Sequence, residues 1–71
     1  MERGFGMLNI RHIRQRLGMS QAEFAEAIGI TQGAVSQWEQ GRTNPAFSKV
    51  CAIAKLMGIT IDQLLAEEKT A

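Results

Sequence analysis

The sequence is poor in three features that would each point to a particular class of protein. It has one cysteine, Cys51, so an intramolecular disulfide is excluded, which fits a reducing cytoplasm. No apolar run approaches the ~20 residues of a membrane-spanning helix, and the first residues lack the pattern of a signal peptide. A net charge of +1 is not the strongly basic balance typical of nucleic-acid-binding chains. We therefore expect a cytoplasmic protein with no membrane partner.

The overall composition is typical of a folded globular protein. The 71 residues are 45% hydrophobic and 21% charged, which predicts one folded domain near the lower size limit for a single apolar core. Cys51 lies in the apolar stretch VCAIAKLM, so we interpret it as a small core residue and not as a reactive thiol.

The charges are unevenly distributed along the chain. Acidic residues outnumber basic ones in IDQLLAEEKTA, whereas basic residues predominate before it. A positive face could be supplied by Arg11, Arg14, Arg16, Arg42 and Lys49. Composition alone does not distinguish such a face from solvated surface charges.

Residues 20–40 are the most informative part of the chain, because they predict two short amphipathic helices joined by a tight turn. Apolar residues recur there at helical intervals, at Phe24, Ile28, Ile30, Val35 and Trp38. Gly29 falls where the first helix must stop and a left-handed residue is favoured. Ala25 is small enough for two helices to cross closely, and Thr31 can cap the second helix. Ser20 and Glu23 form a capping box at the start of the first.

The flanking segments also predict helices, each followed by a glycine or opened by a cap. We expect a helix over 8–17, with Ile10, Ile13 and Leu17 on one face, and another helix over 32–40. A loop containing Pro45 precedes a helix over 48–57, and Thr60 with Gln63 caps a last short helix. No β-alternation interrupts them. The prediction is an all-α, five-helix domain over 8–66, with a flexible arm at 1–7 and a short tail at 67–71.

A small residue, a glycine four positions later and apolar residues on either side are typical of a helix-turn-helix, although spacing alone also allows another antiparallel helical pair. From Ile10 to Leu65 the chain resembles the Cro/lambda-repressor-like (XRE-type) helix-turn-helix family. The similarity lies in LGMSQAEFAEAIGITQGAVSQWEQGRTNP and in IAKLMGITIDQLL, in the family's order. The resemblance implies a five-helix lambda-repressor-like fold that binds operator DNA as a dimer, with the helix-turn-helix at the second and third helices.

The resemblance also assigns roles to individual residues. Positions that face base edges match Gln32, Gly33, Ala34, Ser36 and Gln37. A glutamine amide can pair with adenine at N6 and N7, and small residues let the helix approach closely. Positions that contact the sugar-phosphate backbone match Gln21, Arg42, Thr43 and Asn44, with Lys49 as a weaker candidate.

Other positions are structural in the same resemblance. Arg14 and Glu39 match an ion pair between the first and third helices, so Glu39 is not counted as a base contact. Ala25, Gly29 and Val35 belong to the scaffold of the motif. One feature departs from many family members, because no basic residue lies between Gln32 and Gln40. We therefore do not expect guanine to be read by an arginine of that helix, and DNA shape could contribute to selectivity.

Several functions remain to be compared. The leading hypothesis is a small repressor resembling a phage Cro protein or prophage regulator, and an antitoxin or restriction-modification controller is the alternative. An interaction module that has lost DNA binding is a third. An enzyme is the least favoured, because the sequence shows no metal-ligand cluster, no nucleophile with a base and no phosphate-binding glycine loop. No cofactor or small-molecule ligand is expected. A dimer surface is predicted around Phe47, Met57, Ile59 and Ile61.

Overall fold

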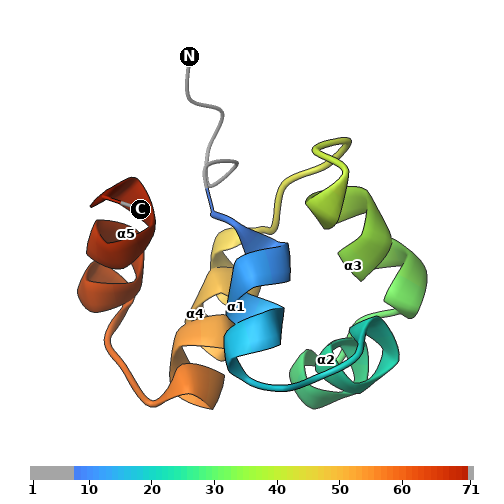
Figure 1. Cartoon of the computed structure of the whole chain (residues 1–71), viewed down its shortest axis with the longest axis horizontal. Coiled ribbons are helices and arrows are strands. Elements are labelled where there is room, and N and C mark those ends of the chain that lie inside the picture. Colours follow the sequence, from blue (N-terminus) through green and yellow to red (C-terminus); the bar gives the residue numbers. More distant parts are fainter. Residues whose placement is uncertain (1–7, 71) are drawn as a thin grey trace.

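The computed structural model describes residues 8–70, and the side chains of residues 8–66. This part of the chain folds into five α-helices and contains no strand (Figure 1). The helices are α1 (Ile10–Arg16), α2 (Gln21–Ile28), α3 (Gln32–Glu39), α4 (Phe47–Met57) and α5 (Ile61–Thr70). The predicted all-α architecture is confirmed. The predicted arm at 1–7 lies outside the described residues.

Three helices, α2, α3 and α5, begin at side-chain caps that the sequence predicts. Ser20 and Glu23 form the reciprocal bonds of a capping box at α2, and Thr60 and Gln63 do the same at α5. The Thr31 hydroxyl accepts the backbone N–H of Ala34 and so caps α3. The predicted start of the first helix at residue 8 is wrong by two residues. There the side chain of Asn9 accepts the backbone N–H of His12 and fixes α1 to begin at Ile10.

The helix ends also follow the sequence closely. Glycines in the left-handed region follow the first four helices, at Gly18, Gly29, Gly41 and Gly58. The first and third helices each end one residue earlier than predicted, at Arg16 and Glu39, and the fourth begins one residue earlier, at Phe47. α5 continues to Thr70, through residues that we had assigned to a tail. Residues 66–69 are alanine, glutamate and lysine, which favour helix, and neither glycine nor proline stops it.

One hydrophobic core joins all five helices. α2 packs against α3 and α4, α1 packs against α3, and α4 packs against α5. The buried residues are Leu8, Ile10, Ile13, Phe24, Ala25, Ile28, Val35, Val50, Ile53, Ala54 and Leu64. Leu17, Ile30, Trp38 and Met57 are half-buried against this core. Ala25 is 3% exposed, so a larger side chain at this position would overpack the core.

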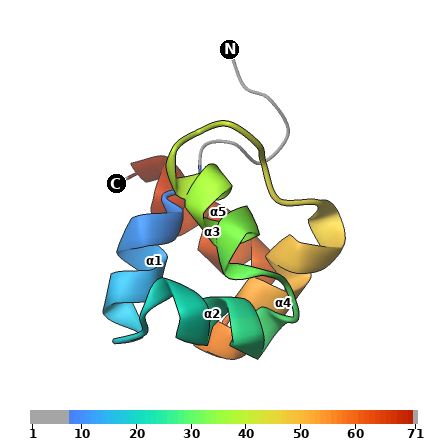
Figure 2. The same ribbon diagram turned by 90° about the vertical axis from the view of Figure 1, so that its right-hand side faces the viewer.

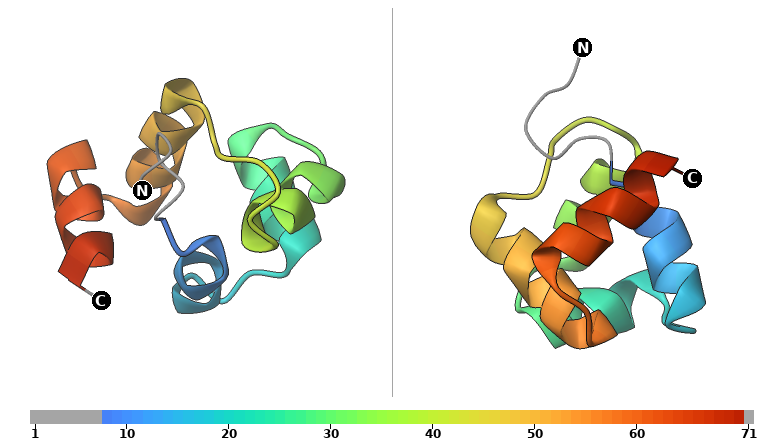
Figure 3. Two further views of the ribbon diagram at one scale, coloured as in Figure 1. Left: turned by 90° about the horizontal axis from the view of Figure 1, so that it is seen from above. Right: turned by 90° about the vertical axis from the view of Figure 1, so that its left-hand side faces the viewer.

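The helix-turn-helix lies at one end of the molecule and α5 lies at the other. This separation is visible along the long axis in Figure 1 and again from above in Figure 3. Turning the molecule so that the α2–α3 end faces the viewer places α3 in front of the bundle (Figure 2). The outer face of α3 is therefore left open to a partner.

Candidate nucleic-acid interface

The outer face of α3 carries uncharged polar and small side chains. Gln32, Gly33 and Gln37 are exposed, and Ala34 and Ser36 are half-buried. Gln32, Gly33, Ser36 and Gln37 are spaced so that they share one side of the helix. The structure thus brings together four of the five residues that the sequence predicts for base contact, and Ala34 lies to one side of them.

Gln40, which we did not select from the sequence, extends this face by one turn. It is exposed, and its Nε2 donates a hydrogen bond of 2.9 Å to the Ser36 Oγ. Since that oxygen accepts from Gln40, the Ser36 hydroxyl hydrogen is available to donate elsewhere. The spacing of four residues between Ser36 and Gln40 could have revealed the pair.

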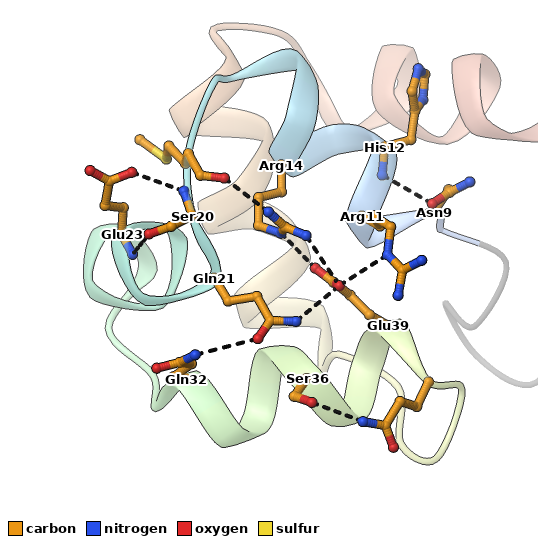
Figure 4. Close-up of polar contacts among 12 residues, drawn as sticks. Asn9, Arg11, His12, Arg14, Ser20, Gln21, Glu23, Gln32, Ser36 and Glu39 are labelled. Carbon is orange, nitrogen blue, oxygen red and sulfur yellow. Dashed lines mark hydrogen bonds and ion pairs between the residues drawn. The ribbon is translucent and has the colours of Figure 1, made fainter.

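Behind this face lies a partly buried ion pair between α1 and α3, as predicted. The Arg14 Nε donates to the Glu39 Oε2 over 2.7 Å, and the Arg14 Nη2 donates to Oε1 over 3.3 Å (Figure 4). The Glu39 side chain is 1% exposed. The Arg14 Nη1 also donates to the Met19 carbonyl, which ties the turn between α1 and α2 to the pair. Removing either partner would leave a buried charge without compensation.

Two further donors converge on the same carboxylate. Arg11, whose side chain is 61% exposed, donates its Nε to the Glu39 Oε1 over 3.3 Å. Gln21 donates its Nε2 to that oxygen over 3.0 Å. The sequence did not predict these two contacts. They also reduce the predicted positive face, because the charges of Arg11 and Arg14 are partly cancelled by Glu39.

Burial of the Glu39 carboxyl would by itself raise its pKa. Hydrogen bonds from Arg14, Gln21 and Arg11, together with the Arg14 charge, outweigh that effect, and the pKa of Glu39 lies below its ordinary value. The hydrogen bond to Glu39 raises the pKa of Arg14 despite its partial burial. Glu39 is therefore an anion in the folded protein at neutral pH.

The remaining predicted backbone contacts lie at the edges of the face. Arg42, Thr43 and Asn44 are exposed in the loop that leaves α3. Gln21 is half-buried at the start of α2, where its Oε1 accepts a hydrogen bond of 3.4 Å from the Gln32 Nε2. Lys49 is half-buried, and its Nζ lies 3.5 Å from the carbonyl of Ile28 at the end of α2. Lys49 thus has a contact within the protein, although its ammonium group keeps two further N–H donors.

His12 is exposed and points away from the Glu39 cluster (Figure 4). Within residues 8–66, no group of histidine, cysteine, aspartate and glutamate side chains is arranged to hold a metal ion. No helix of the described chain has the length and apolar character needed to cross a membrane.

These elements define a five-helix domain with an exposed helix-turn-helix. The sequence profile of the helix-turn-helix family matches residues 10–64, and the chain belongs to that family. It is 34% identical over 58 residues to the HTH-type transcriptional regulator PuuR of Escherichia coli (strain K12), which covers 82% of this chain and 31% of PuuR. It is also 34% identical over 56 residues to repressor protein C2 of Salmonella phage P22, covering 79% of this chain and 26% of that protein. The chain spans between about a quarter and a third of the length of these relatives.

Two solved structures have the same fold as this chain. The P22 c2 repressor in complex with synthetic operator 9T has a TM-score of 0.68 and 30% identity, covering 89% of this chain and 94% of that one. The clp gene regulator ClgR of Corynebacterium glutamicum has a TM-score of 0.76 at 23% identity, covering 92% of this chain and 69% of that one. The similarity to phage repressors confirms the lambda-repressor-like fold predicted from the sequence.

Proposed function

We propose that this chain is a sequence-specific DNA-binding domain of a transcriptional repressor, with α3 in the major groove of its operator. One observation carries the proposal: α3 presents an exposed face of amides and small residues. The one charged side chain of α3, Glu39, is turned inward and paired. The similar P22 c2 repressor, solved with an operator, supports DNA as the partner.

In this proposal the face is divided into base contacts and backbone contacts. Gln32, Gly33, Ala34, Ser36 and Gln37 meet base edges, where amides can donate and accept at once. Gln21, Arg42, Thr43, Asn44 and Lys49 border that face and hold the sugar-phosphate backbone, which sets the register without reading sequence. The acting species is a homodimer on a two-fold symmetric operator, working on the bacterial nucleoid in the cytoplasm.

The test is selection of bound sequences from a random pool of duplex DNA. We expect enrichment of one sequence with two-fold symmetry, and an affinity that falls steeply as the salt concentration rises. A double variant Gln32→Ala and Gln37→Ala should keep the salt dependence and lose most of the enrichment. Failure of the wild-type protein to enrich any sequence would contradict the proposal.

A further inference from the structure

Ser36 and Gln40 form a hydrogen-bonded pair on the outer face of α3 (Figure 4). The Gln40 Nε2 donates to the Ser36 Oγ over 2.9 Å, and the Gln40 backbone N–H donates to the Ser36 carbonyl over 3.0 Å. Ser36 is half-buried and Gln40 is exposed. The backbone bond holds Gln40 in a helical conformation at the C-cap of α3, so its side chain reaches back over the last turn to Ser36.

The electrostatics of this helix end favour the NH₂ group of the Gln40 amide beside Ser36, and not the amide oxygen. Carbonyl groups without intrahelical partners make the C-terminal turn of α3 the negative end of its dipole, and no basic side chain lies in that turn. An amide NH₂ group carries positive partial charge and offers no lone pair. It can therefore donate to the Ser36 Oγ but can accept nothing from it.

The contact with Gln40 gives the Ser36 hydroxyl group a direction. A serine within a helix can donate its hydroxyl hydrogen to the carbonyl four residues earlier, but Ser36 makes no such bond within the part of the chain that the structure describes. The hydrogen cannot point toward the Gln40 NH₂ group, where it would meet another donor. It is therefore left to point outward, and Ser36 presents a donor to a partner that approaches α3.

We propose that Gln40 is a positioning residue that makes Ser36 selective for a base with a carbonyl oxygen, thymine or guanine, over a base with an amine at the same place. This inference rests on the proposed function. In the major groove, cytosine has the N4 amine where thymine has O4, and adenine has the N6 amine where guanine has O6. The outward hydrogen of Ser36 can pair with either oxygen and meets another donor at either amine. A freely rotating hydroxyl group could accept from the amines as well.

The first experiment locates the base pair that Ser36 contacts. Ser36→Ala and the wild type are titrated with the selected operator and with versions in which single carbonyl bases are exchanged in both half-sites, thymine for cytosine or guanine for adenine. We expect Ser36→Ala to lose the wild-type preference at one position of the half-site. Loss at no position would overturn the inference, because Ser36 would then read no base.

The second experiment changes Gln40 and measures the ratio of the affinities for the carbonyl and amine versions of that position. Gln40→Met keeps a side chain of similar length but frees the Ser36 hydroxyl group, so the ratio should fall by at least about fivefold when both half-sites carry the exchange. Gln40→Glu supplies a carboxylate that accepts the hydroxyl hydrogen, so Ser36 would turn a lone pair outward and the ratio should reverse. The added negative charge weakens binding to both DNAs and by itself leaves the ratio unchanged.

The matched controls are Gln15→Met and Gln15→Glu, at an exposed position of α1, and both should leave the ratio unchanged. In a Ser36→Ala background, Gln40→Met should also leave the ratio unchanged, because Gln40 acts through the Ser36 hydroxyl group. A further change there would make Gln40 a base contact in its own right and overturn the positioning role. An unchanged ratio in the folded Gln40→Met variant overturns this inference alone. Absence of specific binding by the wild type overturns the proposed function as well.

Discussion

At the scale of single residues, the candidate interface combines two kinds of contact that respond differently to substitution. An amide on α3 carries a donor and an acceptor and can therefore distinguish bases. An exposed arginine in the following loop carries charge, which all DNA sequences attract equally. Gln32 and Arg42 represent the two kinds.

We expect Gln32→Ala to relax the preference at one base pair in each half-site, by about 1–3 kcal/mol, and to change non-specific binding little. Arg42→Ala should weaken binding to every sequence and lower the salt slope by about 0.9 for each lost phosphate contact. The measurement is titration of both variants with the selected operator, a single-base variant and random DNA at several salt concentrations. If Gln32→Ala lowers the affinity for all three DNAs equally, Gln32 contacts the DNA backbone and not a base.

Gly29 and Gly33 lie close in sequence but are glycine for different reasons. Gly29 ends α2 with φ of +77°, a conformation that costs other L-residues about 1–2 kcal/mol. Gly33 lies within α3, outside the left-handed region, and an added Cβ would meet nothing closer than 3.9 Å. The protein alone thus gives no reason for glycine at position 33, whereas a closely approaching partner does.

Alanine at these two positions should shift the melting temperature in opposite directions. Gly29→Ala should lower it by several degrees, and Gly33→Ala should raise it by a few degrees, because glycine in a helix costs about 0.5–1 kcal/mol. Gly33→Ala should nevertheless weaken operator binding. Thermal denaturation followed by circular dichroism, with DNA titration of the folded variants, checks both points. A Gly33→Ala variant that binds as tightly as the wild type would place position 33 away from the DNA.

At the scale of helices, local signals account for most of what the sequence predicted correctly. Ser20, Thr31 and Thr60 cap helices through residues three positions away, so the pattern is visible within one turn. The start of α1 was missed because Asn9 was not considered as a cap. The face of α3 was also predictable, since it depends on spacing within a single helix.

Contacts between helices were harder to predict. The Arg14–Glu39 pair was expected only through resemblance to a family. Gln21 and Glu39 are 18 positions apart, and Gln21 and Gln32 are 11 apart. Which of the glutamines meets the buried Glu39 carboxylate depends on how α2 crosses α3. That crossing is set by core packing around residues such as Ala25 and Val35 and not by a local pattern.

The Arg14–Glu39 ion pair makes the contact between α1 and α3 sensitive to acid. The folded-state pKa of Glu39 lies below its unfolded value, so the unfolded chain takes up the proton first as pH falls. Its contribution to stability is complete above the ordinary carboxyl pKa of 4.5 and is lost as pH falls through the lower folded-state value. At neutral pH, Glu39→Gln should destabilise the domain by about 3–5 kcal/mol, since Arg14 would lose its charged partner.

Urea denaturation at pH 7 and at acidic pH below 4.5 measures this effect. The gap in unfolding free energy between wild type and Glu39→Gln should narrow in acid, while Glu26→Gln at an exposed position should show little gap at either pH. A gap of the same size at both pH values would show that the Glu39 charge contributes nothing to folding.

At the scale of the whole molecule, the placement of α5 opposite the helix-turn-helix limits how two copies could bind DNA together. Two recognition helices on one face of B-DNA lie about 34 Å apart, so each would lie about 17 Å from the two-fold axis. The domain measures 26 × 26 × 20 Å, so an axis near the end away from α3 is compatible with that spacing. Of the four residues that we predicted for the dimer surface, Phe47 is 57% exposed, and Met57, Ile59 and Ile61 are half-buried against the core.

Substitution of Phe47, at the start of α4, therefore tests the predicted dimer. Because each protomer would bury one such ring, Phe47→Ser should weaken dimerisation by at least about tenfold, whereas Lys55→Ser, at an exposed position of α4, should not. Sedimentation equilibrium measures the dimerisation constant, and titration compares a symmetric operator with an isolated half-site. Since the second recognition helix adds affinity only when the protomers associate, Phe47→Ser should lose much of the preference for the symmetric site while its half-site affinity stays close to that of the wild type. A wild-type protein that stays monomeric and binds the half-site as tightly as the symmetric site would rule out the dimer.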